Sequence, residues 1–100
     1  MKLSDDPQVD EDEPALLFVG LHHAREWPSL EIVLFFADTL TRAYGYDSLI
    51  TELINSCEVY LLPCLNPDGY VYCHDEGNDW RKNRHYFEEF GTYGVDLNRN

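Results

Sequence analysis

Four short groups of residues carry side chains that suit metal binding, proton transfer or anion binding. They are His23-Ala24-Arg25-Glu26, Asn66-Pro67-Asp68-Gly69, Trp80-Arg81-Lys82-Asn83-Arg84 and Gly94-Val95-Asp96-Leu97-Asn98-Arg99-Asn100. The first group places an imidazole three residues before a carboxylate, and both are zinc ligands in proteins. That spacing alone is more typical of a surface pair than of a metal site, and two protein ligands are one fewer than a catalytic zinc site uses.

Arginine side chains gather beside these groups. Of the six basic residues after residue 13, five are arginines, and four of those lie within or next to the groups: Arg25, Arg81, Arg84 and Arg99. A guanidinium pairs with a carboxylate through two parallel hydrogen bonds. In an otherwise acidic chain, this placement indicates an anion-binding pocket.

The first group follows a predicted strand. Residues Ala15 to Gly20 are apolar, short and closed by glycine, which favours a buried strand, and α/β folds build their sites where such strands end. A helix is predicted over Ser29 to Tyr44, with Pro28 in its first turn. A shorter helix is predicted to begin after Asp47 as its N-cap and to end at Asn55 and Ser56.

The second half of the chain shows less regular patterning. Residues Val59 to Cys64 predict another buried strand, and the segment from Asn66 to Gly69 predicts a structural turn without a catalytic part. Residues from Tyr70 to Asn100 show no sustained period and are expected to be irregular. The order of strand, helix and strand favours an α/β fold, a partial mixed sheet with helices packed on it.

Composition restricts the partners. The chain has 19 acidic and 7 basic residues and a net charge of −12, so we expect no nucleic-acid and no membrane partner. Six acids fall in the first 13 residues, which predicts an acidic loop over residues 1–14 of a single partial domain, 1–100. The three cysteines are an odd number without CxxC spacing, which fits neither a full disulfide framework nor a cysteine zinc site.

The order and spacing of the four groups resemble the zinc metallocarboxypeptidases of the carboxypeptidase A and B type, peptidase family M14, from about Ala15 to Asn100. The resemblance implies a part of their eight-stranded fold. It implies His23 and Glu26 as the first two ligands of one Zn²⁺, and Arg25 as part of an outer substrate subsite. It implies Arg81 as the residue that stabilises the oxyanion of the reaction, a task that suits a permanently charged, planar guanidinium.

Three further residues receive roles from the resemblance. Asn98 and Arg99 match the pair that binds the terminal carboxylate of the substrate, and Asp96 matches a carboxylate that hydrogen-bonds the first zinc histidine. No role falls to the other histidines or to two basic residues: His22, His74, His85, Lys82 and Arg84. Asn78 stands where many relatives have another arginine.

We therefore predict a zinc-dependent metallocarboxypeptidase that releases C-terminal amino acids from peptides or proteins. The resemblance places the third zinc ligand and the general base after residue 100, so we expect this chain to be an N-terminal part that is inactive alone. It also leads us to expect secretion, without a signal peptide in this chain. Exposed edges of the truncated sheet are expected to permit self-association. The alternatives are a related zinc amide hydrolase, either a deacylase or a murein peptide amidase, or a non-catalytic carboxylate-binding relative.

Overall fold

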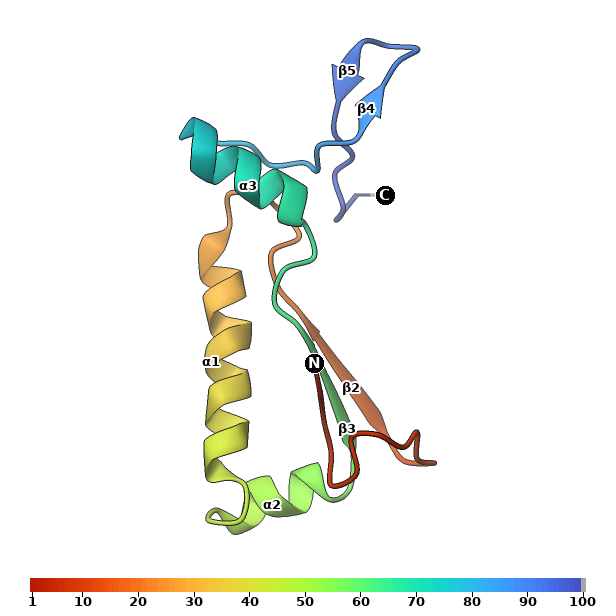
Figure 1. Cartoon of the computed structure of the whole chain (residues 1–100), viewed down its shortest axis with the longest axis vertical. Coiled ribbons are helices and arrows are strands. Elements are labelled where there is room, and N and C mark those ends of the chain that lie inside the picture. Colours follow the sequence, from red (N-terminus) through yellow and green to blue (C-terminus); the bar gives the residue numbers. More distant parts are fainter. Residues whose placement is uncertain (100) are drawn as a thin grey trace.

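A three-stranded mixed sheet organises the first two thirds of the chain (Figure 1). Its strands are β1 (Lys2–Leu3), β2 (Ala15–Val19) and β3 (Glu58–Leu62), in the order β1-β3-β2. Strand β2 is parallel to β3, whereas β1 is antiparallel to it. This computed structural model describes residues 1–99, and Asn100, which ends the segment predicted to be irregular, lies outside them. The predicted mixed α/β class is confirmed.

Two helices connect β2 to β3. Helix α1 (Trp27–Ala43) begins two residues before the predicted start, with Pro28 in its first turn as expected. Helix α2 (Ser48–Ile54) begins after Asp47, whose carboxylate accepts hydrogen bonds from the backbone N–H groups of Leu49 and Ile50 at 2.9 and 3.1 Å. This cap satisfies N–H groups that have no partner within the helix.

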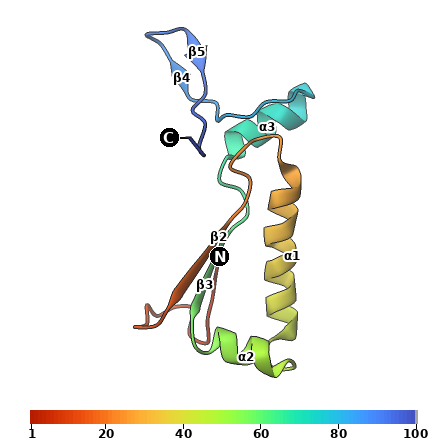
Figure 2. The same ribbon diagram turned by 180° about the vertical axis from the view of Figure 1, so that it is seen from behind.

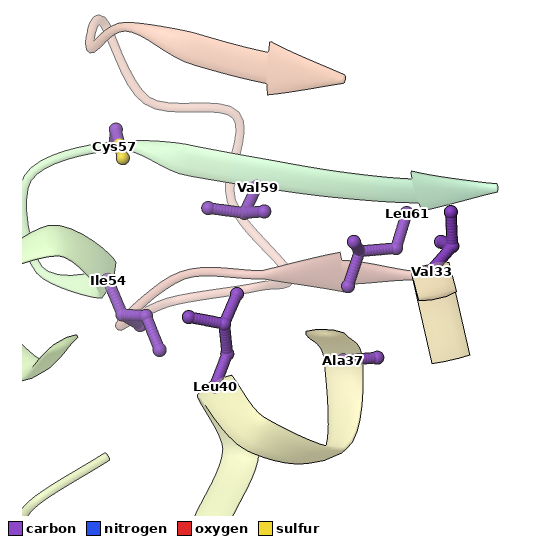
Figure 3. Packing of buried hydrophobic residues seen from close by; sticks show 7 residues of the cluster. All are labelled: Val33, Ala37, Leu40, Ile54, Cys57, Val59 and Leu61. Carbon is purple, nitrogen blue, oxygen red and sulfur yellow. The ribbon is translucent and has the colours of Figure 1, made fainter. Parts of the chain in front are cut away.

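The hydrophobic core lies between α1, α2 and the central strand β3 (Figure 3). Its buried residues are Val33, Ala37, Leu40, Ile54, Cys57, Val59 and Leu61. Each fully buried leucine or valine contributes about 1.5–3 kcal/mol through loss of apolar surface from water. Helix α1 thus covers one face of the sheet, in which β2 and β3 lie side by side as parallel partners (Figure 2).

Residues 15–20 were predicted to form a buried strand; the strand is present, but the prediction that it is buried is wrong. The first four residues of strand β2 are exposed, and Leu17 is 67% exposed. The reason is position: β2 lies at the edge of the sheet, and within residues 1–99 no element lies on its other side. A hollow of about 240 Å³ opens between β2 and α1, lined by Phe18, Ile32, Val33, Phe35 and Phe36.

The prediction of an irregular segment after residue 70 is also wrong. Helix α3 (Pro67–Glu76) begins at the predicted turn, and β4 (Tyr86–Phe87) pairs with β5 (Thr92–Tyr93) as a hairpin. Asn66 caps the helix, and Gly77, with φ +59°, ends it in the left-handed conformation that suits glycine. Both elements lie beyond the carboxyl ends of β2 and β3 (Figure 1).

The acidic segment, residues 1–14, includes one short element. Strand β1 lies within it, and Lys2 pairs with the buried Glu58 of β3, with Nζ and Oε1 2.5 Å apart. The cysteines Cys57, Cys64 and Cys73 are all free thiols. Among the described residues, no helix has both the length and the apolar character that a bilayer crossing requires.

Candidate functional site

The loop that follows β2 presents His23 and Glu26 on a tight turn. The backbone N–H of Glu26 donates to the carbonyl of His23 at 3.0 Å, which brings the two side chains to the same side. Gly20 precedes the loop, and a Cβ there would lie 2.6 Å from the carbonyl oxygens of Pro63 and Ser29. Only glycine lets the loop leave the sheet this close to the start of α1.

His23 is buried, and its two ring nitrogens face carboxylates on opposite sides. Nε2 lies 3.0 Å from Asp96 Oδ1, and Nδ1 lies 2.9 Å from Glu26 Oε2. An ionised carboxylate only accepts hydrogen bonds, so Nε2 carries the proton shared with Asp96, and in the neutral ring Nδ1 presents a lone pair. Nδ1 is buried and has no hydrogen-bond partner, because a lone pair and a carboxylate oxygen are both acceptors.

This arrangement fits a bound cation. Without one, the lone pair of His23 Nδ1 and a carboxylate oxygen of Glu26 face each other with no shared hydrogen bond, and a buried unpaired acceptor costs about 1–3 kcal/mol. Imidazole nitrogen and carboxylate oxygen are both ligands that Zn²⁺ accepts. The opposite hydrogen bond to Asp96 fixes the ring in the orientation that a metal-binding histidine needs.

Asp96 links His23 to Arg81. Its Oδ2 accepts from Arg81 Nε at 2.9 Å, and its Oδ1 also accepts from the backbone N–H of Asn98 at 3.0 Å. Hydrogen bonds from Arg81, Asn98 and His23 hold the pKa of the Asp96 carboxyl well below its usual range, although burial opposes them. Asp96 is therefore a negatively charged acceptor for both neighbours at neutral pH.

The structure brings four of the seven predicted site residues together by side-chain contacts. Besides the contacts above, Arg81 Nη1 lies 3.9 Å from Glu26 Oε1, so Arg81 faces the same space as the His23–Glu26 pair. Arg25 instead points to the exposed Asp79, with Nη1 and Oδ2 2.9 Å apart.

Asn98 and Arg99 have exposed side chains, and the Arg99 backbone N–H donates to the carbonyl of Asp96 at 3.1 Å. Arg99 Nη1 donates to the carbonyl of Asn98, and the exposed guanidinium and the Asn98 amide still offer hydrogen-bond donors on one turn, which suits a carboxylate ligand. Their role in binding substrate stays a prediction, as do the roles of the other site residues.

Among the residues without a predicted role, Arg84 makes structural contacts, whereas the exposed histidines do not join the site. His74 and His85 are exposed, and neither lies with His23 and Glu26. Arg84, expected to have no role, has its guanidinium carbon 3.7 Å from the ring centre of Tyr72 and 4.2 Å from that of Tyr93. It therefore joins α3 to the hairpin through cation–π contacts. A lone arginine after a polar run gives no sequence signal for such a contact.

A third ligand for His23 and Glu26 is not found among residues 1–99. Within that range, the only group of three histidine, cysteine or acidic side chains close enough to share an ion is Asp5, Glu11 and Glu13, in the acidic segment. The candidate centre, as described, offers one imidazole and one carboxylate.

Fold and site together define an α/β domain of the zinc carboxypeptidase type, and comparison with known proteins agrees. The family model of zinc carboxypeptidases matches residues 1–100. Carboxypeptidase A2 of Rattus norvegicus is 42% identical over 89 residues, which cover 89% of this chain and 21% of that protein. An inactive metallocarboxypeptidase, ECM14, of Uncinocarpus reesii is 42% identical over 84 residues, 84% of this chain and 14% of that protein.

Among solved structures, the crystal structure of thrombin activatable fibrinolysis inhibitor is similar with a TM-score of 0.87 at 35% identity. The similarity covers 99% of this chain and 24% of that one. The chain therefore belongs to the zinc carboxypeptidase family. It spans about a fifth of the length of its rat relative.

Proposed function

We propose that the protein carrying this chain is a zinc-dependent metallocarboxypeptidase that removes C-terminal amino acids from peptides by hydrolysis. The observation that carries the proposal is the state of His23. Its Nδ1 is buried without a hydrogen-bond partner beside the Glu26 carboxylate, while Asp96 holds Nε2. One zinc ion with His23 and Glu26 as ligands would satisfy both groups.

Each nearby side chain then has a task. Bound zinc would supply a Lewis acid that polarises the scissile carbonyl and lowers the pKa of a water molecule toward about 7. Arg81 stabilises the oxyanion that develops on that carbonyl; its Nε is bound by Asp96, which leaves its terminal nitrogens to face the substrate. Asp96 keeps both His23 and Arg81 in place.

Substrate recognition falls to the exposed turn after Asp96. Asn98 and Arg99 are proposed to bind the terminal carboxylate of the peptide, which restricts cleavage to the C-terminal residue. Arg25 is proposed to contact residues further along the substrate, although its guanidinium is paired with Asp79 in this structure.

The catalytic centre requires more than these residues provide. We propose that residues 1–100 are the N-terminal portion of the catalytic domain, and that a third zinc ligand and a general-base glutamate come from the rest of the protein. The 100-residue chain alone is then expected to bind zinc weakly and to be inactive. By analogy with the family, we propose that the protein is secreted.

Zinc affinity measured by calorimetry tests this function. In a protein that extends this chain through the whole catalytic domain, His23→Ala should weaken zinc binding at least about a hundredfold, because a direct ligand is lost. His74→Ala is the matched control, since His74 is an exposed histidine outside the site. Zinc bound equally well by His23→Ala and the unsubstituted protein contradicts the assignment.

A second candidate is a non-catalytic relative that binds carboxylate ends, and one observation favours keeping it. A protein named as an inactive metallocarboxypeptidase is as similar to this chain, at 42% identity, as the rat carboxypeptidase is. Release of free amino acids from peptides with an unblocked C-terminus separates the two. Binding of such peptides without release would favour the inactive relative, and release from C-terminally amidated substrates would instead favour an amide hydrolase.

A further inference from the structure

The side chain of Asn66 bridges the two loops that carry the candidate zinc ligand and the candidate oxyanion arginine. Its Nδ2 donates to the carbonyl of His22 and to the carbonyl of Lys82, both at 3.1 Å. His22 directly precedes His23, and Lys82 directly follows Arg81. Asn66 is 1% exposed, so these bonds form away from water, where their loss is costly.

The same side chain caps α3. Its Oδ1 accepts from the backbone N–H of Gly69 at 3.1 Å, and this bond is buried. The position thus needs one acceptor and two donors on a short side chain, and asparagine supplies all three. Aspartate has nearly the same shape but no donor, so it would keep the cap and turn its second oxygen toward two carbonyl oxygens.

Gly69 lets the start of α3 lie between the two loops. A Cβ at this position would lie 2.5 Å from Asn66 Oδ1, 2.7 Å from the carbonyl oxygen of Lys82 and 2.9 Å from Ala24 Cβ. The loops also contact each other directly, because the backbone N–H of Ala24 donates to the carbonyl of Arg81 at 3.0 Å. The start of α3 therefore sets how far apart the two loops lie.

We infer that Asn66 is a positioning residue that holds the backbone of His23 in place against the backbone of Arg81. The side chains of these residues are joined separately, through Asp96. Asn66 adds a second link, between the two backbones, because its Nδ2 bonds to the carbonyls of His22 and Lys82. The inference deepens the proposed function and rests on it, because it names a residue on which the spacing of that site depends.

The consequence for catalysis follows from where Arg81 acts. It is proposed to bind charge that appears only in the transition state, so an altered distance between His23 and Arg81 should lower kcat more than it raises KM. The side chain of Asn66 hydrogen-bonds to the backbone of His22, Lys82 and Gly69, not to Asn98 or Arg99, which are proposed to bind the substrate carboxylate. We expect Asn66→Asp to lower kcat about tenfold or more, with KM changed by less than about threefold.

Amide hydrogen exchange provides a readout that does not depend on activity. In the whole catalytic domain carrying Asn66→Asp, the amide of Ala24 should lose protection about tenfold or more, because the loops separate. The amide of Gly69 should keep its protection to within about threefold, since aspartate still accepts from it. A residue with only a capping role would leave Ala24 unchanged.

Asn55→Asp is the matched control, since it makes the same chemical change at the exposed end of α2, where the side-chain oxygen accepts from the Tyr44 hydroxyl. It should leave kcat, KM and the exchange of Ala24 unchanged. If Asn66→Asp does not fold, Gly69→Ala serves as the second variant, because its methyl group would separate the same loops. It should reduce the protection of Ala24 in the same way.

The outcomes are distinct. Loss of protection at Ala24 with retention at Gly69, together with a fall in kcat, supports the inference. Unchanged exchange at Ala24 in Asn66→Asp, or in Gly69→Ala where the first variant does not fold, overturns it, as does an unchanged kcat. Failure of the unsubstituted protein to bind zinc overturns the proposed function instead, and exchange at Ala24 then decides alone whether Asn66 holds the loops together.

Discussion

Leu21 adopts a left-handed backbone conformation, with φ +52°, two residues before His23. For a non-glycine residue this costs about 1–2 kcal/mol, so other contacts must hold it. Leu21 is fully buried, and its N–H donates to the hydroxyl of Ser29 at 2.9 Å. That hydroxyl in turn donates to the carbonyl of Glu26 at 2.7 Å. Ser29 thus fixes both ends of the loop that carries His23.

Substitution of Ser29 by alanine should therefore destabilise the protein. The N–H of the buried Leu21 would lose its acceptor, which costs about 1–3 kcal/mol, whereas the Glu26 carbonyl keeps the backbone N–H of residue 29 as a donor. We expect the free energy of unfolding in urea to fall by about 1–2 kcal/mol.

Thr39→Ala is the control, because Thr39 also donates to a backbone carbonyl, that of Phe35 at 2.8 Å, but on the exposed side of α1. Its substitution should change the free energy of unfolding by less than about 0.5 kcal/mol. Equal effects of the two substitutions would show that the Ser29 hydroxyl does not hold the loop.

At the residue scale, the sequence was enough to predict which charged or metal-binding side chains belong to the candidate site. His23, Glu26, Arg81 and Asp96 stand in recognisable motifs, and the structure brings them into contact. Asn66 was predicted to have only a turn role. Its side chain bonds to carbonyls 44 and 16 residues away, and contacts of that separation have no local sequence signal.

At the element scale, Glu58 attaches the acidic segment to the central strand. Its carboxylate is buried and accepts from Lys2, from the Tyr60 hydroxyl at 2.8 Å and from the backbone N–H of Glu11 at 3.1 Å. Hydrogen bonds from Lys2, then Glu11 and Tyr60, lower the pKa of Glu58 from 4.5 to about 2. Folding therefore favours the ionised form of this carboxyl.

The sign of the resulting pH dependence follows directly. A carboxyl whose pKa is lower in the folded state stabilises the fold above its unfolded pKa and loses that contribution as the pH falls. For Glu58 the loss should occur between about pH 4.5 and pH 2. Glu58→Gln should reduce the free energy of unfolding at pH 6 and flatten its decline over this window.

Urea unfolding of both proteins from pH 6 to pH 2 tests this dependence, and the difference between them isolates Glu58 from other carboxyls such as Asp96. Parallel curves for the two proteins across the window would contradict the prediction.

Element predictions succeeded where the pattern was long or capped. Helix α1 has a wide apolar face, and Asp47 marks the start of α2, so both were located to within a few residues. Helix α3 was missed because only Gly69 and Cys73 are buried along it, which leaves no apolar period to detect. The hairpin was missed because its strands have two residues each, too few for an alternation to appear.

At the scale of the whole molecule, the chain is elongated and leaves apolar surface uncovered. Its extents are 52 × 27 × 20 Å and its radius of gyration is 17.0 Å, against about 13 Å for a compact domain of this length. Leu17 on β2 and Phe35 on α1 are 67% and 73% exposed. Leu17 lies on the sheet face away from α1, since its neighbour Phe18 packs on Phe36 of α1, so these are two separate exposed apolar sites. Exposed apolar residues on an edge strand that has no partner on its outer side among residues 1–99 favour association. The net charge of −12 opposes it through repulsion.

These two forces predict how the isolated 100-residue chain behaves in sedimentation velocity. Self-association should increase with salt, because screening weakens the repulsion between chains while the apolar contact persists. Leu17→Lys should reduce association at every salt concentration, since it places a charge on the exposed face of the edge strand. Leu49→Lys, on α2, changes a leucine of similar exposure, 75%, outside the edge strand, and should have little effect. If both substitutions change association equally, the β2 face does not control it. An assembly that weakens with salt would indicate ion pairs in place of apolar contact.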